Sequence, residues 1–214
     1  MSRCAVNISW RRGGRRRRRA VRDALYVRLA DGDVVLEPLS KAHREPLRAA
    51  CAADADVWHI YASNFGPENF DTAFGSLIGH PSRMPYAIIA GGEVVGMTAW
   101  LRADWSAETI EIGNSYIHPA QRRTGLNGRV KRLMLEHAFG VGIRRVEFRI
   151  DERNARSQAA VGKLGAVKEG VLRAERMTWT GHVRDTGLFS ILADEWRAAT
   201  ASALVQPASG NQKP

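Results

Sequence analysis

The sequence is poor in cysteine and has no long apolar run. Its two cysteines, Cys4 and Cys51, fit no metal-binding spacing, and so few thiols indicate a reducing compartment. We therefore expect a cytoplasmic protein. No apolar stretch approaches the roughly 18 residues that a membrane span requires, so we expect no membrane contact. The six histidines form no H-x-H or H-x-x-x-H pair, and we expect no metal site.

Two common phosphate-binding motifs are also missing. The chain contains no G-x-x-x-x-G-K-[ST] motif, which disfavours a nucleoside triphosphatase. It contains no G-x-G-x-x-G motif opening a βαβ unit, which disfavours a dinucleotide-binding fold. With 214 residues, of which 44% are hydrophobic, the chain is long enough for one domain with a sizeable core.

Acidic residues are absent from the first 22 positions, which hold nine arginines. Since the whole chain carries a net charge of +10, the remainder is close to neutral, at +1. A segment so rich in arginine cannot bury apolar surface, so we expect residues 1–26 to be a disordered Arg-rich tail. We expect a folded domain over 27–200 and a disordered end over 201–214. The tail could contact RNA or the ribosome through phosphates. Alternatively, translation begins near Val21 or Val27.

The most informative segment is the loop from Ile117 to Arg129. It follows a strand-like run and opens a helix-like run, so it leaves backbone N–H groups unpaired at a helix N-terminus. Such a terminus is a ready site for a phosphate or pyrophosphate. Gly125 allows close approach of the backbone, and Arg122 and Arg123 add mobile positive charge. The segment therefore predicts a phosphorylated cofactor held by main chain.

The hexapeptide Arg122-Arg-Thr-Gly125-Leu-Asn127 resembles the [RQ]-x-x-G-x-[GA] coenzyme A loop of the GCN5-related N-acetyltransferase (GNAT) superfamily. Asn127 departs from the Gly or Ala of that pattern, but asparagine tolerates unusual backbone angles. The resemblance implies acetyl-CoA as co-substrate. It also implies cofactor contacts from six loop residues, Arg122, Arg123, Thr124, Gly125, Leu126 and Asn127.

A second motif supports the same family. A strand over 145–151 is followed by Asn154, Ser157 and a short helix that ends in Leu-Gly165-Ala. With closing strands at 169–173 and 181–190, this resembles the branch that acetylates N-termini of ribosomal proteins. The resemblance covers residues 34–197. It implies transfer of acetyl to a primary amine by direct attack on the thioester, in a monomer or a homodimer.

Strands and helices are expected to alternate along the chain. The patterns predict strands at 34–39, 85–90, 94–101, 109–117 and 145–151 before the closing pair, and helices at 40–53, 67–77, 126–139 and 154–164. This order indicates an α/β fold with helices on both faces of a mixed sheet. The resemblance implies a GNAT-like, mostly antiparallel twisted sheet.

Acetyl transfer needs a base, because amines are largely protonated near neutral pH. Our preferred base is Glu111, on the strand that leads into the loop. Regular alternation would place it on one face with Gly113, Ser115 and Ile117, where glycine leaves room for a substrate. The competing explanation is an exposed strand glutamate or a structural ion pair with an arginine. The family resemblance also implies that a backbone N–H near Ile117 stabilises the oxyanion.

Three further residues are candidates. Glu175 is a second possible base, although it lies one position away from the glutamate of the ribosomal-protein branch. Ser157 resembles the serine that protonates the departing thiolate in that branch, or it serves the helix start. Asn154 resembles the asparagine that contacts the pantetheine arm, or it is an N-cap.

The acceptor remains open. In this superfamily the acceptor groove is built by segments that correspond to 54–74 and 173–184, which here are rich in aromatic side chains. Four acids in the first segment could attract a cationic acceptor: Asp54, Asp56, Glu68 and Asp71. A peptide N-terminus, an amine metabolite and an aminoglycoside-like compound are all compatible. A non-catalytic acyl-CoA-binding or RNA-associated protein is the alternative from another class.

Overall fold

Eight strands form one sheet in the order β1-β2-β3-β4-β5-β6-β8-β7 in the computed structural model, which describes residues 14–205. Neighbouring strands are antiparallel except β5 and β6, which are parallel. The mixed, mostly antiparallel sheet confirms the predicted fold class. The strands are β1 (Leu29–Asp31), β2 (Val34–Pro38), β3 (Met84–Ala90), β4 (Glu93–Asp104), β5 (Thr109–Ile117), β6 (Arg145–Asp151), β7 (Val167–Met177) and β8 (Val183–Leu192).

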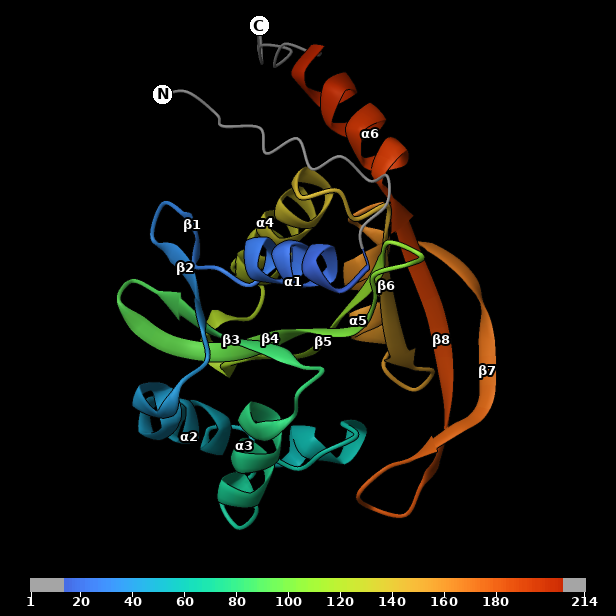
Figure 1. Cartoon of the computed structure of the whole chain (residues 1–214). Helices are drawn as coiled ribbons and strands as arrows, with labels where there is room; N and C mark the ends of the chain where they lie inside the picture. The colour runs from blue at the N-terminus through green and yellow to red at the C-terminus, as the bar shows by residue number, and fades with distance from the viewer. Residues whose placement is uncertain (1–13, 206–214) are drawn as a thin grey trace, which may run out of the picture.

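Helices cover both faces of this sheet (Figure 1). One face carries α2 (Arg44–Ala52) and α3 (Phe70–Gly79), which begins three residues after the predicted start. The other carries α1 (Gly14–Leu25) and α4 (Leu126–Gly140). Two hydrophobic clusters correspond to the two faces. The remaining helices are α5 (Ala155–Gly162), α6 (Ala193–Val205) and short 3-10 turns at Lys41–His43, Asp56–Ile60 and Pro119–Gln121.

The N-terminal boundary differs from the expectation of disorder over residues 1–26. Residues 14–25 form α1, and Val21 and Leu25 are fully buried. These two residues are one helical turn apart, and Leu25 belongs to the hydrophobic cluster on the α4 face of the sheet. Tyr86 Oη donates to the Leu25 carbonyl at 3.0 Å and fixes the end of the helix. Residues 1–13 lie outside the described residues, and contact of this segment with RNA or the ribosome stays a prediction.

The C-terminal boundary also differs. α6 continues past residue 200 to Val205, and the rest of the expected disordered end, residues 206–214, lies outside the described residues. Trp196 anchors this helix through its ring, which packs 6.3 Å from that of Phe139. No helix within residues 14–205 has both the length and the apolar character required to cross a membrane.

The two parallel strands separate part-way along their length. β5 and β6 pair from Thr109↔Arg145 to Glu111↔Glu147, and no pairing between them follows. The second half of β5 stays bonded to β4 on its other side. One edge of β5 is therefore open from residue 112 onward, and the residues predicted as the active site lie along this edge.

Candidate active site

The loop before α4 presents two backbone N–H groups at a helix N-terminus. α4 begins after Gly125, whose φ of 88° lies in the left-handed region that glycine adopts without strain. The first hydrogen bond of the helix runs from the Arg129 N–H to the Gly125 carbonyl at 3.1 Å. Within the described chain, no acceptor contacts the N–H groups of Asn127 and Gly128. Both are available to an anion, as the sequence pattern predicts.

Thr124 and Leu126 shape this loop. The Thr124 hydroxyl donates to the Gln121 carbonyl at 2.9 Å and accepts from the Leu126 N–H at 3.3 Å. The side chain of Leu126 is buried in the core on the α4 face. Both residues thus hold the loop in place, and their direct contact with a cofactor stays a prediction.

The two arginines of the loop differ from each other. Arg122 is fixed, because Nε donates to the Ile117 carbonyl at 3.1 Å and Nη1 lies 2.5 Å from Asp54 Oδ2. The expectation of mobile charge is therefore wrong for Arg122, whose charge is already neutralised by Asp54. Arg123 is exposed, with a φ of 66°. Of the two, Arg123 is the one free to meet a phosphate.

A bulge in β5 changes which side chains share a face. Met97 pairs with Tyr116 and Ala99 with Gly113, so β5 carries one extra residue, at Asn114 with φ 50°. The alternation that placed Ser115 and Ile117 beside Glu111 is wrong beyond this bulge. Ser115 turns to the α4 face instead, where its hydroxyl accepts from the buried Nζ of Lys131.

The backbone of Ile117 faces the gap between β5 and β6. The next N–H along the strand, that of His118, donates to Val95 of the β4 end at 2.8 Å. Since peptide groups alternate along a strand, the N–H and C=O of Ile117 point to the opposite edge. The bond from Arg122 to the Ile117 carbonyl agrees with this direction.

Asn154 is the N-cap of α5. Its Oδ1 accepts from the Ser157 N–H at 3.0 Å, so the N-cap explanation is correct for this oxygen. The amide nitrogen of Asn154 and the hydroxyl of Ser157 make no hydrogen bond within the described chain. Both groups are therefore available to a ligand, and cofactor contact by Asn154 stays a prediction.

An open groove of about 500 Å³ runs beside Asn154. One wall comes from the turn at Asp56–Ile60, and the other comes from Arg153, Asn154 and Arg156. The tip of the β7–β8 hairpin meets the same turn, because Trp179 Nε1 donates to the Trp58 carbonyl at 2.7 Å and the Trp179 ring packs 5.3 Å from that of His59. The two predicted acceptor segments therefore lie side by side.

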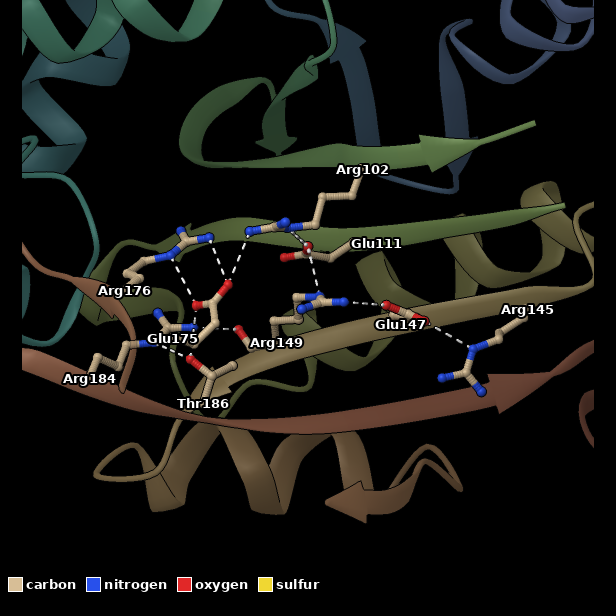
Figure 2. A network of polar contacts seen from close by, with 9 residues as sticks. All are labelled: Arg102, Glu111, Arg145, Glu147, Arg149, Glu175, Arg176, Arg184 and Thr186. Carbon is tan, nitrogen blue, oxygen red and sulfur yellow. Dashed lines mark hydrogen bonds and ion pairs between the residues drawn. The ribbon is translucent and has the colours of Figure 1, made fainter. Parts of the chain in front are cut away.

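Glu111 lies at the last parallel pair, where β5 and β6 begin to separate. Its side chain is 7% exposed, and its Oε2 lies 3.1 Å from Arg102 Nε and 3.8 Å from Arg149 Nε (Figure 2). Burial raises the pKa of Glu111, and this effect outweighs the arginines, which lower it. A Cβ at Gly113 would lie 2.8 Å from Glu111 Oε1, so glycine there leaves space for the carboxylate.

Glu175 belongs to the same cluster. Its Oε1 lies 3.2 Å from Arg102 Nη2, and its Oε2 lies 3.2 Å from Arg176 Nε and accepts from the Thr186 hydroxyl at 3.3 Å (Figure 2). Burial alone would raise the pKa of Glu175, but Arg176 and the other arginines lower it overall. The register of β7 shifts between Leu172 and Arg176, so face assignment by simple alternation fails here too. Arg102, which contacts both carboxylates, is a site residue that the sequence did not indicate.

The chain matches known acetyltransferases in sequence and in structure. The sequence model of the acetyltransferase (GNAT) domain matches residues 33–167. The chain belongs to the GNAT acetyltransferase family. A crystal structure from T. thermophilus, described as an acetyltransferase, is 32% identical over 84% of this chain and 97% of that one, with a TM-score of 0.75. No curated protein sequence matches the chain.

Other GNAT structures extend the comparison. A GCN5-related N-acetyltransferase from Brucella melitensis is 27% identical over 88% of this chain and 91% of its own, with a TM-score of 0.77. RimJ of Mycobacterium smegmatis, in complex with CoA-disulfide, is 20% identical over 79% and 89% of the two chains, with a TM-score of 0.66. GNAT acetyltransferases use acetyl-CoA, and the protein is an N-acetyltransferase. Among the described residues, no group of His, Cys, Asp or Glu side chains is arranged to hold a metal ion.

Proposed function

We propose that the protein transfers acetyl from acetyl-CoA to the primary amine of a protein or peptide N-terminus, with Glu111 as the general base. The observation that carries this proposal is the place of Glu111. Its buried carboxylate lies at the point where β5 and β6 separate and beside the strand edge that ends at Ile117.

Glu111 suits the role of base because its environment raises its pKa. An α-amino group has a pKa near 8, so it must lose a proton before it can attack the thioester carbonyl. A carboxylate that accepts this proton, directly or through a water, contributes roughly 10²–10⁴-fold to the rate. A base whose pKa lies closer to the working pH is more effective, which favours Glu111 over Glu175.

Two other groups complete the proposed chemistry. The Ile117 N–H points from the open edge of β5, where it can donate to the oxygen that becomes negative as the amine attacks. Such a donor contributes about 10²–10³-fold to the rate. The hydroxyl of Ser157 makes no hydrogen bond within the described residues and is the proposed proton donor to the departing thiolate.

Binding of acetyl-CoA rests on the start of α4 and the groove beside α5. The N–H groups of Asn127 and Gly128 and the side chain of Arg123 are the proposed ligands of the pyrophosphate. Gly125 gives the loop the backbone conformation that this arrangement needs. Asn154 lines the groove and offers its amide nitrogen to the pantetheine arm.

Support for a peptide acceptor comes from two sources. The segments proposed to build the acceptor groove meet through Trp58 and Trp179, and their aromatic surface suits a peptide end. The sequence around Asn154 and Ser157 also resembles that of the ribosomal-protein branch.

The test is thiol release from acetyl-CoA with short peptides that have free N-termini, the same peptides with blocked N-termini, and small amines. We expect turnover on free peptides and none on blocked ones. Ser157→Ala should lower kcat without weakening acetyl-CoA binding, whereas Ser76→Ala on the exposed side of α3 should change neither. Turnover confined to small amines would overturn the acceptor, and failure to bind acetyl-CoA would overturn the function.

A further inference from the structure

Arg83 and Glu111 lie in one row across the sheet. Leu101 of β4 pairs with Glu111 of β5, and Met84 of β3 pairs with Trp100 of β4, so position 83 lies beside Leu101. Adjacent strands are about 4.8 Å apart, which puts the backbones of Arg83 and Glu111 about 10 Å from each other. A long side chain such as that of arginine spans much of this distance.

The same row lies on the acceptor face of the sheet. Three residues next to this row point into the core on the α4 side: Met84, Trp100 and Ile112. By alternation, Glu111 points to the opposite face, the one that carries α2 and α3, and Arg83 would do the same if the alternation of β3 continues to the residue before it. The turn at Asp56–Ile60 and the β7–β8 hairpin tip lie on that side as well.

Arg83 is half-buried and has no carboxylate partner. Within residues 14–205 its side chain makes no ion pair or hydrogen bond. Burial lowers its pKa, and the nearby positive charge of Arg176 lowers it further. Arg176 is already paired with Glu175, so the uncompensated charge is that of Arg83, and a bound anion would relieve it.

The surrounding cluster has an excess of positive charge. Six arginines lie among five carboxylates here: Arg102, Arg145, Arg149, Arg153, Arg176 and Arg184 with Glu111, Glu147, Asp151, Glu169 and Glu175. Arg83 adds a seventh guanidinium group, near Arg176. The ion pairs of the cluster therefore do not neutralise it.

Two of the four acids that could attract a cationic acceptor are neutralised by arginines, whereas Asp56 and Glu68 form no ion pair within the described residues. Asp54 is paired with Arg122, and Asp71 is paired with both Arg44 and Arg48. The unpaired Arg83 and the arginine excess beside Glu111 therefore favour an acceptor with an anionic group over a polyamine.

We propose that Arg83 and Arg176 form an oxyanion site, and that the acceptor is an amine whose molecule also carries a carboxylate or a phosphate. The proposal rests on the proposed function, and it narrows the acceptor to peptides with an acidic group near the N-terminus. A guanidinium fork matches the geometry of both oxyanions, so both chemistries belong in the test.

The experiment compares kcat/KM for matched peptides in wild type, Arg83→Met and Arg132→Met. The peptides carry Asp, Asn, phosphoserine or serine at the second position. We expect wild type to prefer an anionic peptide over its neutral match about tenfold or more, as a charge-assisted hydrogen bond implies. Arg83→Met should abolish the preference through KM. Arg132, exposed on α4, is the matched control and should leave it unchanged.

Each outcome decides the proposal. Equal use of acidic and neutral peptides by wild type, or a preference that survives in Arg83→Met, would overturn it. Preference for Asp alone or for phosphoserine alone would identify the oxyanion. If no peptide is acetylated, the proposed function fails, and calorimetric binding of the acidic peptide then tests the site separately. Binding that is lost in Arg83→Met would support the site, and no binding to wild type would overturn it.

A folding defect is checked by the melting temperature of each variant. If Arg83→Met does not fold, Arg83→Lys serves in its place, because lysine keeps the charge and loses the fork. The lysine variant should retain part of the preference for anionic peptides. If Arg83→Lys keeps the full preference for anionic peptides, a bidentate guanidinium contact is not required. If it uses anionic and neutral peptides equally, the proposed oxyanion site is overturned.

Discussion

Arg102 holds Glu111 through a contact of 3.1 Å between Nε and Oε2, and its other end contacts Glu175. Arg102 itself has a φ of 48° at a register shift in β4, so its backbone is held in an unusual conformation. One guanidinium group therefore sets the charge environment of both candidate bases. Removal of Arg102 is therefore the simplest way to change the pKa of Glu111 while keeping its carboxylate.

Arg102→Met should shift the pH dependence of the reaction. Burial raises the pKa of Glu111, and Arg102 opposes that effect. Without Arg102 the pKa rises further, so Glu111 stays protonated to higher pH. The acidic limb of the kcat/KM profile should therefore move to higher pH. Arg28→Met, which breaks an exposed ion pair with Glu37, is the control and should leave the profile in place. An unmoved limb in Arg102→Met would exclude Glu111 as the titrating base.

Lys131 should make stability depend on pH. Its Nζ is buried and bonded to the hydroxyls of Thr98 and Ser115, and burial lowers its pKa to about 7. In the unfolded chain its pKa is near 10.4, so the unfolded state binds the proton more tightly. The free energy of unfolding should therefore rise between about pH 7 and pH 10, and Lys131→Met should flatten this rise. Urea unfolding at pH 7 and pH 9.5 measures this rise in wild type and in Lys131→Met. An equal rise in unfolding free energy in the two proteins would contradict the account.

Gly125→Ala tests the loop conformation. The φ of 88° is unfavourable for alanine, although its Cβ would meet no other atom. We expect a loss of about 1–2 kcal/mol in the free energy of unfolding, together with weaker acetyl-CoA binding. Gly128→Ala, in the first turn of α4, should instead be neutral or stabilising by up to about 1 kcal/mol. Chemical denaturation measures the change in unfolding free energy, and calorimetry measures the change in acetyl-CoA affinity. Equal losses in Gly125→Ala and Gly128→Ala would show that the positive φ of Gly125 is not their cause.

Leu25→Ala tests whether α1 is part of the folded domain. Leu25 is fully buried in the core on the α4 face, so its truncation should cost about 2–5 kcal/mol of unfolding free energy. Arg19→Ala on the exposed side of the same helix should change stability by less than about 0.5 kcal/mol. Equal stability of the two variants in urea would mean that α1 does not pack on the sheet.

Motifs with short spacing could be predicted from the sequence. The start of α4 at Leu126 and the cap at Asn154 each depend on residues within a few positions, so their local chemistry decides them. The order of elements from β2 to β8 could also be predicted, because apolar periodicity sets it, whereas β1 and α6 were not predicted. The same reasoning missed α1, because a stripe of two apolar residues is hidden in a segment dominated by arginine.

Features set by tertiary contacts could not be predicted. Arg102 and Glu175 are 73 residues apart in the sequence, and no local pattern links them. The bulge at Asn114 depends on how β4 pairs with β5, and it reverses the face of Ser115. Arg122 matched the family pattern, but its partner Asp54 comes from a distant segment and neutralises its charge.

The most direct test of the account compares Glu111→Gln with Glu147→Gln. Glu147 pairs with Arg145 and Arg149 in the same cluster, so its loss disturbs the network without removing the proposed base. The measurement is kcat for thiol release on a free peptide, with acetyl-CoA affinity measured in parallel. Glu111→Gln should lower kcat by roughly 10²–10⁴-fold with unchanged affinity, and Glu147→Gln should lower it far less. Equal losses in both variants, or full activity in Glu111→Gln, would contradict the account.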